Sequence, residues 1–220
     1  GAEAVECAVK LIRSHGLRHD PDKITIVTFK NAFHGRTLGA QLAGGIPALK
    51  QWIVNLDPNI VQVPFPDGFR HADTSFDGFL HGLAEAGAVP EQVAGVITET
   101  YQGGNSSFAP VPYVQELRQW CDQHGALLVF DEVQAGFGRC GTYWGFEYYG
   151  VAADLICCGK GISGGPPLSA VIGGHEVMDI FPPGSMTSTH SGNPLVVAGA
   201  LANVRAIEED RLVENAAQLG

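Results

Sequence analysis

The feature that most constrains the fold of this 220-residue chain is the alternation of short apolar runs with longer amphipathic stretches. Six runs predict strands, at residues 24–29, 60–65, 93–99, 126–133, 154–159 and 169–174. Several are apolar without interruption, which is typical of strands covered on both faces. Helical stretches lie at the start of the chain and at residues 74–86, 111–124 and 193–210. This order predicts an α/β fold with a mostly parallel sheet and helices on both faces.

A lysine and an aspartate stand where two of these apolar runs end. The run 155–158 leads into Gly159 and Lys160, and the run 126–130 leads into Asp131. Ligands of open α/β sheets bind beyond the carboxyl ends of the strands, so both side chains are expected at one site. A strand-end amine can form a Schiff base, and a partly desolvated carboxylate needs a partner such as a protonated ring nitrogen. The pair indicates an aldehyde cofactor.

Two further segments are candidates for cofactor contacts. Phe33 and His34 follow the first strand and its loop, where the aromatic face can stack on a planar ring; the alternative is an ordinary surface turn. Residues 188–194 combine hydroxyl side chains with Gly192 and place Pro194 at the start of the last helix. Such a helix start suits an anion like phosphate, although simple capping of the helix explains the same residues.

One glycine motif imitates a dinucleotide site. Gly136, Gly138 and Gly141 fit the G-x-G-x-x-G pattern after a strand. That fingerprint requires a helix to follow directly, whereas residues 142–146 are aromatic and interrupted by glycine. We therefore do not expect a nicotinamide or flavin site.

A second motif imitates the nucleophile of α/β-hydrolases. Ser163 lies in a G-x-S-x-G pattern, and Asp179 and His190 follow in the order of a hydrolase triad. The serine of such an elbow enters a helix, which Pro166 and Pro167 prevent here. A hydrolase that uses Ser163 is the alternative that rests on sequence pattern alone.

Composition argues against several classes of function. A net charge of -10 disfavours nucleic acid, which requires a basic face. No apolar stretch approaches the roughly 18 residues of a membrane helix. Five cysteines without C-x-x-C spacing predict reduced thiols and a cytoplasmic location. No cluster of Cys, His and Asp has the spacing of metal ligands, so we expect no metal.

Both ends of the chain predict an internal segment of a longer protein. The first helical pattern begins at residue 1 with no capping side chain or preceding strand. The last pattern continues toward Gly220 without a finishing element. We therefore expect that the chain is truncated at both ends.

Seven segments follow one another in a fixed order. They read G-A-E-A-V-E at 1–6, F-H-G-R-T at 33–37, E-x-x-Q-G at 99–103, F-D-E-V-Q-A-G-F-G-R at 130–139, G-K-G at 159–161, P-L-S-A-V-I-G at 167–173 and S-T-x-x-G-N-P at 188–194. Together they closely resemble the class III aminotransferases of the ornithine and 4-aminobutyrate type, which depend on pyridoxal phosphate. The resemblance implies the large cofactor-binding domain of a fold-type I enzyme over residues 1–220, with the small domain largely outside.

The resemblance implies roles around the cofactor ring. Lys160 would form the Schiff base with the cofactor and then act as the base and acid of the proton shift. Asp131 would hold the ring nitrogen protonated. Gln134 would contact the ring hydroxyl, and Phe33 would stack on the ring.

The resemblance also implies contacts with the cofactor phosphate. Gly1 and Ala2 match the end of a phosphate-binding turn, and Thr189 matches a threonine that reaches the phosphate of a neighbouring subunit, which implies a homodimer. Glu99 matches a glutamate that supports the region of Asp131. The expected cofactor-binding residues are Gly1, Ala2, Phe33, His34, Glu99, Asp131, Val133, Gln134, Lys160 and Thr189.

The implied reaction is transfer of an amino group from an ω-amino acid or amine to a 2-oxo acid. A racemase or decarboxylase of the same family would use Lys160 and Asp131 equally well and stays an alternative. One position departs from the family pattern, since Gly104 stands where ornithine-type members carry a second glutamate. This departure weakens the case for strict ornithine specificity.

Overall fold

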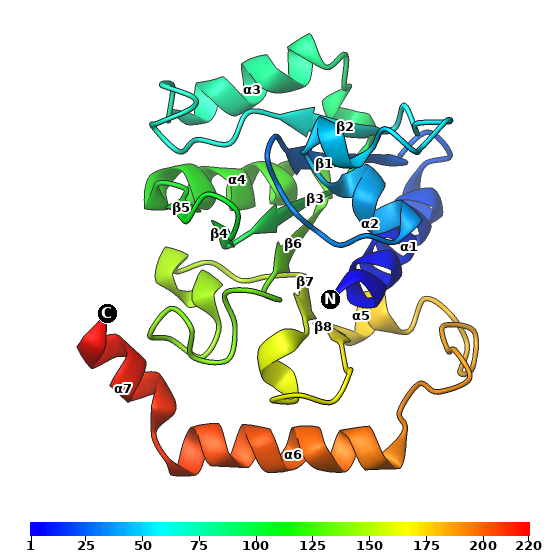
Figure 1. Ribbon diagram of the computed structural model, residues 1–220. Coiled ribbons are helices and arrows are strands. Elements are labelled where there is room, and N and C mark those ends of the chain that lie inside the picture. Colours follow the sequence, from blue (N-terminus) through cyan, green and yellow to red (C-terminus); the bar gives the residue numbers. More distant parts are fainter.

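The computed structural model describes all residues, 1–220, and has at its centre a six-stranded sheet in the order β2-β1-β3-β6-β7-β8 (Figure 1). The strands are β1 (Thr25–Phe29), β2 (Ile60–Val63), β3 (Val93–Glu99), β6 (Leu127–Asp131), β7 (Leu155–Cys158) and β8 (Ala170–Gly173). The first five are parallel to their neighbours, and β8 pairs antiparallel with β7. Every residue of β1, β3 and β6 is buried. The predicted mostly parallel sheet is confirmed.

Helices cover both faces of this sheet, as predicted. Helices α3 (Phe76–Glu85) and α4 (Val111–His124) pack on one face, where Phe79, Leu117 and Trp120 share a core cluster with β-strand residues. Helix α1 (Ala2–His19) covers the other face, with α2 (Leu38–Ala43) and α5 (His175–Met178) beside it. The buried residues of α1 recur with helical spacing, which is why this segment lies along the sheet with one apolar side inward.

The loops beyond the strand ends carry the smaller elements. A hairpin of β4 (Tyr101–Gln102) and β5 (Ser107–Phe108) follows β3. Short 3-10 helices occupy Pro47–Leu49, Pro90–Gln92, Gly145–Tyr149 and Lys160–Ile162. None of the helices combines the length and apolarity needed to cross a membrane.

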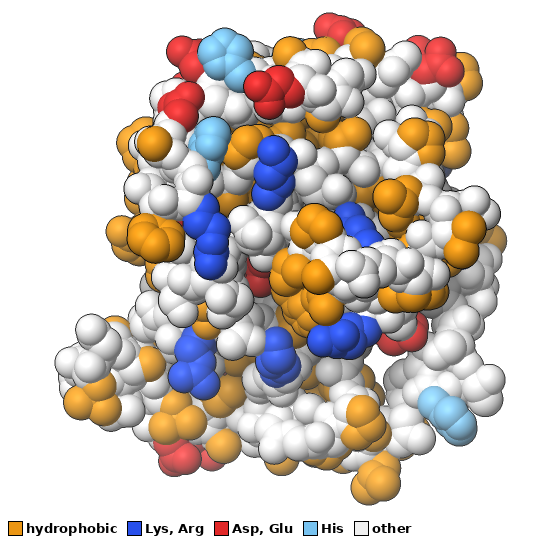
Figure 2. Space-filling model, turned by 45° about the horizontal axis from the view of Figure 1, so that its top comes forward, with side chains coloured by type: hydrophobic (Ala, Val, Ile, Leu, Met, Phe, Trp, Pro, Cys, Tyr) orange, Lys and Arg blue, Asp and Glu red, His pale blue; other side chains and the backbone are white.

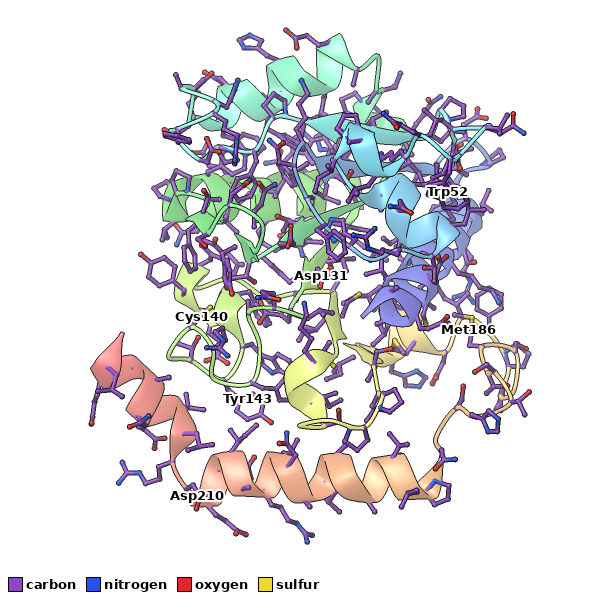
Figure 3. All side chains as sticks on the ribbon, viewed as in Figure 1. Trp52, Asp131, Cys140, Tyr143, Met186 and Asp210 are labelled. Carbon is purple, nitrogen blue, oxygen red and sulfur yellow. The ribbon has the colours of Figure 1, made fainter.

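The last two helices, α6 (Pro194–Glu209) and α7 (Leu212–Leu219), lie along one side of the molecule (Figure 1). A change of direction at Arg211, whose φ is 52°, separates them, so the predicted last helix ends at Glu209. Its N-terminus is capped by Asn193, whose Oδ1 accepts the amide of Leu195 at 3.0 Å. Figure 3 labels Asp210 at the junction of the two helices.

Candidate active site

Three neighbouring strands bring acidic and basic side chains to one edge of the sheet. Glu99 ends β3 and is paired in register with Asp131, which ends β6. Asp131 is paired in turn with Cys157 of β7, two residues before Gly159 and three before Lys160. Because these strands are parallel, their carboxyl ends meet at the same edge. The sheet thus places the three side chains in one region, as the sequence predicts for Lys160 and Asp131.

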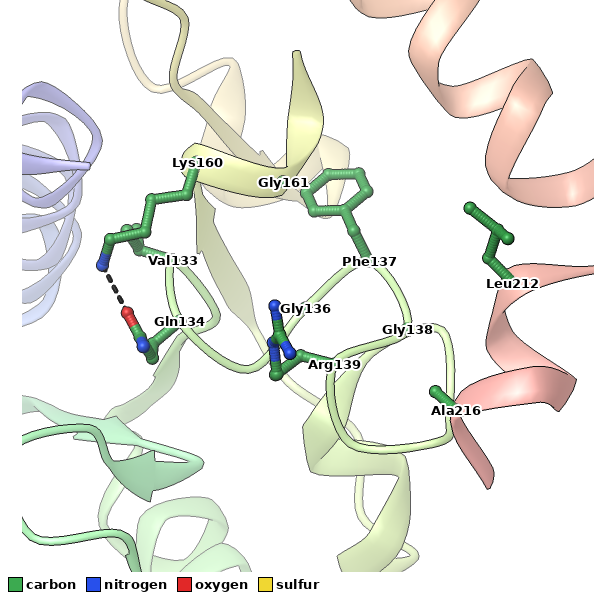
Figure 4. A pocket seen from close by; sticks show the side chains of 10 residues that line it. All are labelled: Val133, Gln134, Gly136, Phe137, Gly138, Arg139, Lys160, Gly161, Leu212 and Ala216. Atoms are coloured by element: carbon green, nitrogen blue, oxygen red, sulfur yellow. Dashed lines mark hydrogen bonds between the residues drawn. The ribbon is translucent and has the colours of Figure 1, made fainter. Parts of the chain in front are cut away.

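Lys160 has an unusual backbone conformation. Its φ is 36°, in the left-handed region that costs a residue with a side chain about 1–3 kcal/mol. Its Nζ is exposed and donates a hydrogen bond to Gln134 Oε1 at 2.6 Å (Figure 4). The following residue is also held, because Asn203 of α6 donates to the Gly161 carbonyl at 2.7 Å. The lysine therefore projects from a fixed, strained turn, which is a feature common at functional sites.

Asp131 forms a buried pair with His34. The Nδ1 of His34 lies 2.7 Å from Asp131 Oδ2, and Asp131 Oδ1 accepts the amide of Val133 at 3.1 Å. Burial alone lowers the pKa of His34, but the hydrogen bond and the charge of Asp131 outweigh it and raise the pKa above its ordinary value. The His34 Nε2 is buried without a partner. The histidine thus holds the carboxylate in place.

Glu99 accepts hydrogen bonds from the backbone of two loops. One carboxylate oxygen accepts the amide of Phe33 at 3.0 Å, and the other accepts the amide of Gly103 at 3.2 Å. Burial raises the pKa of Glu99, although His34 and these amides oppose that effect. Glu99 thus fixes the loop that carries Phe33 and His34. The Phe33 side chain itself is exposed.

The start of α1 lies against the ends of β6 and β7. A Cβ atom at Gly1 would lie 3.0 Å from Val133 Cγ1, and one at Gly159 would lie 2.7 Å from the Gly1 nitrogen. Gly1 caps α1 without a side-chain hydrogen bond. Amides of a helix's first turn have no partner within the helix, so they suit an anion. Gly1 and Ala2 thus lie at the start of a helix, next to the loops that follow β6 and β7.

Thr189 is apart from these residues. It lies in the loop between α5 and α6, it is exposed, and no side-chain hydrogen bond ties it to the rest of the chain. In Figure 3, Met186, which lies in the middle of this loop three residues before Thr189, is well away from Asp131. The structure therefore brings nine of the ten expected residues to one edge of the sheet and leaves Thr189 outside.

The hydrolase pattern does not form a site. Ser163 is buried and its hydroxyl donates to the carbonyl of Pro166. Asp179 pairs with His175, at 2.8 Å, and not with His190. No hydrogen bond joins Ser163 to Asp179 or His190, so the serine has no base beside it. The glycine motif also lacks the helix of a dinucleotide site, because the 3-10 helix Gly145–Tyr149 follows it.

A cavity of about 270 Å³ opens beside Lys160 (Figure 4). It includes Arg139, a residue to which sequence reasoning assigned no role although it ends the segment 130–139. A second arginine in the motif segments, Arg36, has its guanidinium carbon 5.7 Å from the centre of the Phe33 ring. Both arginines are exposed. Both arginines could have been noticed in the sequence, because each lies in a motif segment already assigned to the site and has no acidic residue next to it.

Glu132 anchors the loop that carries Arg139. It is fully buried, and its carboxylate accepts the Thr100 hydroxyl and the amides of Gly145 and Phe146, at 2.6 and 3.0 Å. Burial raises its pKa. Three donors converge on one carboxylate, so Glu132 ties the two ends of the loop 133–145 together.

We expect the substitution Glu132→Gln to lower the free energy of unfolding by about 1–3 kcal/mol, because the amide turns an NH₂ group toward a donor and leaves it unsatisfied. Urea denaturation of both proteins measures the difference. The matched control is Glu116→Gln, since Glu116 is exposed on α4 and should change stability by less than about 0.5 kcal/mol. Equal effects of the two substitutions would contradict this role of Glu132.

Gly104, the position that departs from the family pattern, lies at the tip of the β4–β5 hairpin. It is exposed, and a Cβ atom there would meet nothing within 4 Å. A glutamate side chain would therefore fit at this position, and the glycine leaves the hairpin tip without that acidic group.

Known proteins similar to this chain include aminotransferases. The family model described as aminotransferase class-III matches residues 1–220. The chain is 39% identical to an acetylornithine aminotransferase of Thermosynechococcus vestitus, over 100% of this chain and 52% of that protein. It is 35% identical to a 4-aminobutyrate aminotransferase of Escherichia coli, over 100% of this chain and 51% of that protein. The chain thus spans about half the length of the curated relatives it matches.

Solved structures give the same result. An amine transaminase from an uncultivated Pseudomonas species, determined in its PLP-bound form, superposes with a TM-score of 0.90 at 30% identity, over 100% of this chain and 54% of that one. A transaminase from the marine bacterium Virgibacillus superposes with a TM-score of 0.88 at 30% identity, over 98% of this chain and 50% of that one. Taken with the match over residues 1–220, these findings show that the chain belongs to the class III aminotransferases, a family that depends on pyridoxal phosphate.

Proposed function

We propose that the protein containing this chain transfers an amino group from an ω-amino acid or amine, of the 4-aminobutyrate or ornithine-like class, to a 2-oxo acid. The observation that carries the proposal is the convergence of Lys160 with the Asp131–His34 pair at neighbouring strand ends. An accessible amine and a buried carboxylate are the two groups that this cofactor's chemistry requires of a protein.

The residues present fit pyridoxal phosphate. A carboxylate has about four lone-pair positions that can accept hydrogen bonds, and Asp131 uses two of them, for His34 and the Val133 amide. It can therefore still accept a hydrogen bond from a protonated ring nitrogen. Phe33 offers an exposed aromatic face, and Gly1 and Ala2 offer helix-terminal amides for the phosphate. We infer that Val133, Gln134 and Glu99 complete the cofactor site.

Each side chain has a definable task in this proposal. When bound, the cofactor supplies a ring that accepts the electron pair left when a proton leaves the carbon that bears the amino group. Lys160 Nζ removes that proton and returns one, and Gln134 Oε1 holds the amine in position. The charge of Asp131 keeps a proton on the ring nitrogen, and His34 orients Asp131.

The test is an assay of the complete protein with pyridoxal phosphate, a panel of amines and ω-amino acids, and 2-oxoglutarate. We expect one glutamate to form for each donor consumed, and no turnover without the oxo acid. Donor loss without glutamate, or inversion of the donor's stereochemistry, would instead indicate a decarboxylase or a racemase, and would overturn the proposal.

We further propose that this segment is the large cofactor-binding domain of the complete protein and that the protein is a homodimer. The exposure of Thr189, which lies away from Asp131 in its own chain, supports a contact with a neighbouring subunit. The five free cysteines suit a reducing, cytoplasmic location. Sedimentation of the complete protein as a monomer would contradict the dimer.

A further inference from the structure

Asn203 is the only residue of α6 whose side chain makes a hydrogen bond to another element of the chain. Its Nδ2 donates to the carbonyl of Gly161 at 2.7 Å, in the turn that begins with Lys160. Only Ala200 and Ile207 of this helix are buried. Figure 2 shows hydrophobic side chains at the surface along the lower edge of the molecule, where α6 runs in Figure 1. The specific link between α6 and the turn is therefore the side chain of Asn203.

Asn203 contacts this turn at a second place. A Cβ atom added at Gly164 would lie 2.5 Å from Asn203 Oδ1 and 3.1 Å from its Cγ, so the amide group packs directly on the backbone of Gly164. Gly164 has a φ of 65°, in the left-handed region. One side chain thus holds both Gly161, through its carbonyl, and Gly164, through packing.

The turn has few hydrogen bonds of its own. The amide of Ile162 donates to the carbonyl of Gly159 at 3.0 Å, and the amide of Ser163 donates to the carbonyl of Lys160 at a longer 3.4 Å. Lys160 has a φ of 36°, and a residue with a side chain keeps such a conformation only where its surroundings enforce it. The hydrogen bond from Asn203 supplies such a restraint from outside the turn.

The conformation of this turn decides where the amine of Lys160 lies. Figure 4 shows the Lys160 side chain leaving the turn toward Gln134, and Nζ lies 2.6 Å from Gln134 Oε1. If the φ of Lys160 relaxed to the negative values that residues with side chains prefer, its Cα–Cβ bond would point in another direction and Nζ would move away from Gln134. The position of the amine therefore depends on what holds the turn.

We propose that Asn203 is a positioning residue for Lys160, because its hydrogen bond to Gly161 keeps the strained turn in the conformation that presents the amine to the cofactor aldehyde. The inference rests on the proposed function, in which Lys160 forms the Schiff base. In that step Nζ of the neutral amine forms a double bond with the aldehyde carbon, and the aldehyde oxygen leaves as water with the two amine protons. Asn203 takes no part in this chemistry and raises the fraction of molecules whose amine lies within reach.

The first measurement compares two ligands of the complete, cofactor-free protein. Pyridoxal phosphate reports Schiff-base formation through its visible absorbance, whereas pyridoxine phosphate has no aldehyde and reports only the rest of the cofactor site. We expect Asn203→Ala to slow Schiff-base formation by about 3–10-fold, as for the loss of one hydrogen bond. The same substitution should change the Kd of pyridoxine phosphate by less than about 2-fold.

Two further variants separate the hydrogen bond from other effects. Asn203→Asp keeps the shape of the side chain but removes the donor, so it should slow Schiff-base formation as Asn203→Ala does. Asn215→Ala is the matched control, because Asn215 is exposed on α7 and should change neither ligand's binding. Equal changes for the two ligands would mean that Asn203 only supports the fold, and no change for either would mean that the turn does not need it. Both results would overturn the inference.

The second measurement needs no cofactor. Hydrogen exchange of the cofactor-free complete protein, followed by mass spectrometry, reads the amides of Ile162 and Ser163. We expect Asn203→Ala to speed their exchange by about 3–10-fold and to leave peptides of β3 unchanged. Unchanged exchange in the turn would overturn the inference. Faster exchange, in a protein whose Lys160 traps no cofactor under borohydride, would uphold the action of Asn203 on the turn and overturn the proposed function instead.

Discussion

Replacing Lys160 with alanine is expected to lower turnover by at least about 10²–10⁴-fold, the contribution of a positioned acid–base group, because no other side chain presents an amine at this strand end. Covalent attachment of the cofactor should disappear as well. Borohydride reduction followed by mass spectrometry should find one cofactor on the native protein, at Lys160, and none on the variant.

Two further variants separate the chemistry of Lys160 from its charge. Lys160→Arg keeps a cation at the turn but removes the nucleophilic amine, so it should be as inactive as Lys160→Ala. Lys30→Ala, at an exposed lysine near the end of β1, should retain full activity. Activity or cofactor trapping that survives in Lys160→Ala would assign the Schiff-base lysine elsewhere.

Replacing Asp131 with asparagine is expected to reduce kcat by about 10²–10³-fold, the range for loss of one preorganised electrostatic partner. The amide keeps the shape of the side chain but cannot stabilise a proton on the ring nitrogen. Because Lys160 is unchanged, borohydride should still trap the cofactor on the variant. Asp77→Asn, an exposed residue of α3, is the matched control for a lost carboxylate.

The same substitution gives a pH-dependent effect on stability. Asp131 raises the pKa of His34 in the folded protein. The pair therefore contributes its full amount to the free energy of unfolding below the ordinary histidine pKa of about 6.5, and this contribution is lost as the pH rises through the raised pKa of His34. Asp131→Asn should therefore destabilise the cofactor-free protein by about 1–3 kcal/mol under acidic conditions and by less at alkaline pH. An NMR titration should show a lower His34 pKa in the variant. A pKa of His34 that does not change would contradict the pairing.

Much of the fold follows from patterns within the sequence. The six apolar runs coincide with the six strands to within about two residues at each end, because strands buried on both faces leave a continuous apolar signature. The predicted helix at 111–124 is α4, and Gly125 follows it with a φ of 58°, as expected at a helix C-terminus. The antiparallel direction of β8 was not predicted, because residues 169–174 look the same in either direction.

Parts of the site could not be predicted from the sequence. Asn203 holds the turn after Lys160 through a hydrogen bond to Gly161, a residue 42 positions away in the sequence. Glu132 holds the loop of Arg139 through hydrogen bonds to residues 13 and 14 positions away. Neither residue carries a local signal, because an asparagine on a helix and a glutamate after a strand have many other uses. The pairing of His34 with Asp131 likewise joins residues 97 apart.

The sequence by itself determined the order of strands and helices, and it placed Lys160 and Asp131 at strand ends, because burial and backbone propensity act locally. The resemblance carried by its motifs indicated the cofactor, and the family is now shown. Only the tertiary structure decided that β3, β6 and β7 are neighbours, that His34 closes on Asp131, and that Arg139 faces the cavity of Lys160. These facts depend on which strands pair across the sheet and on loops held by distant hydrogen bonds, and such long-range choices leave little trace in local sequence.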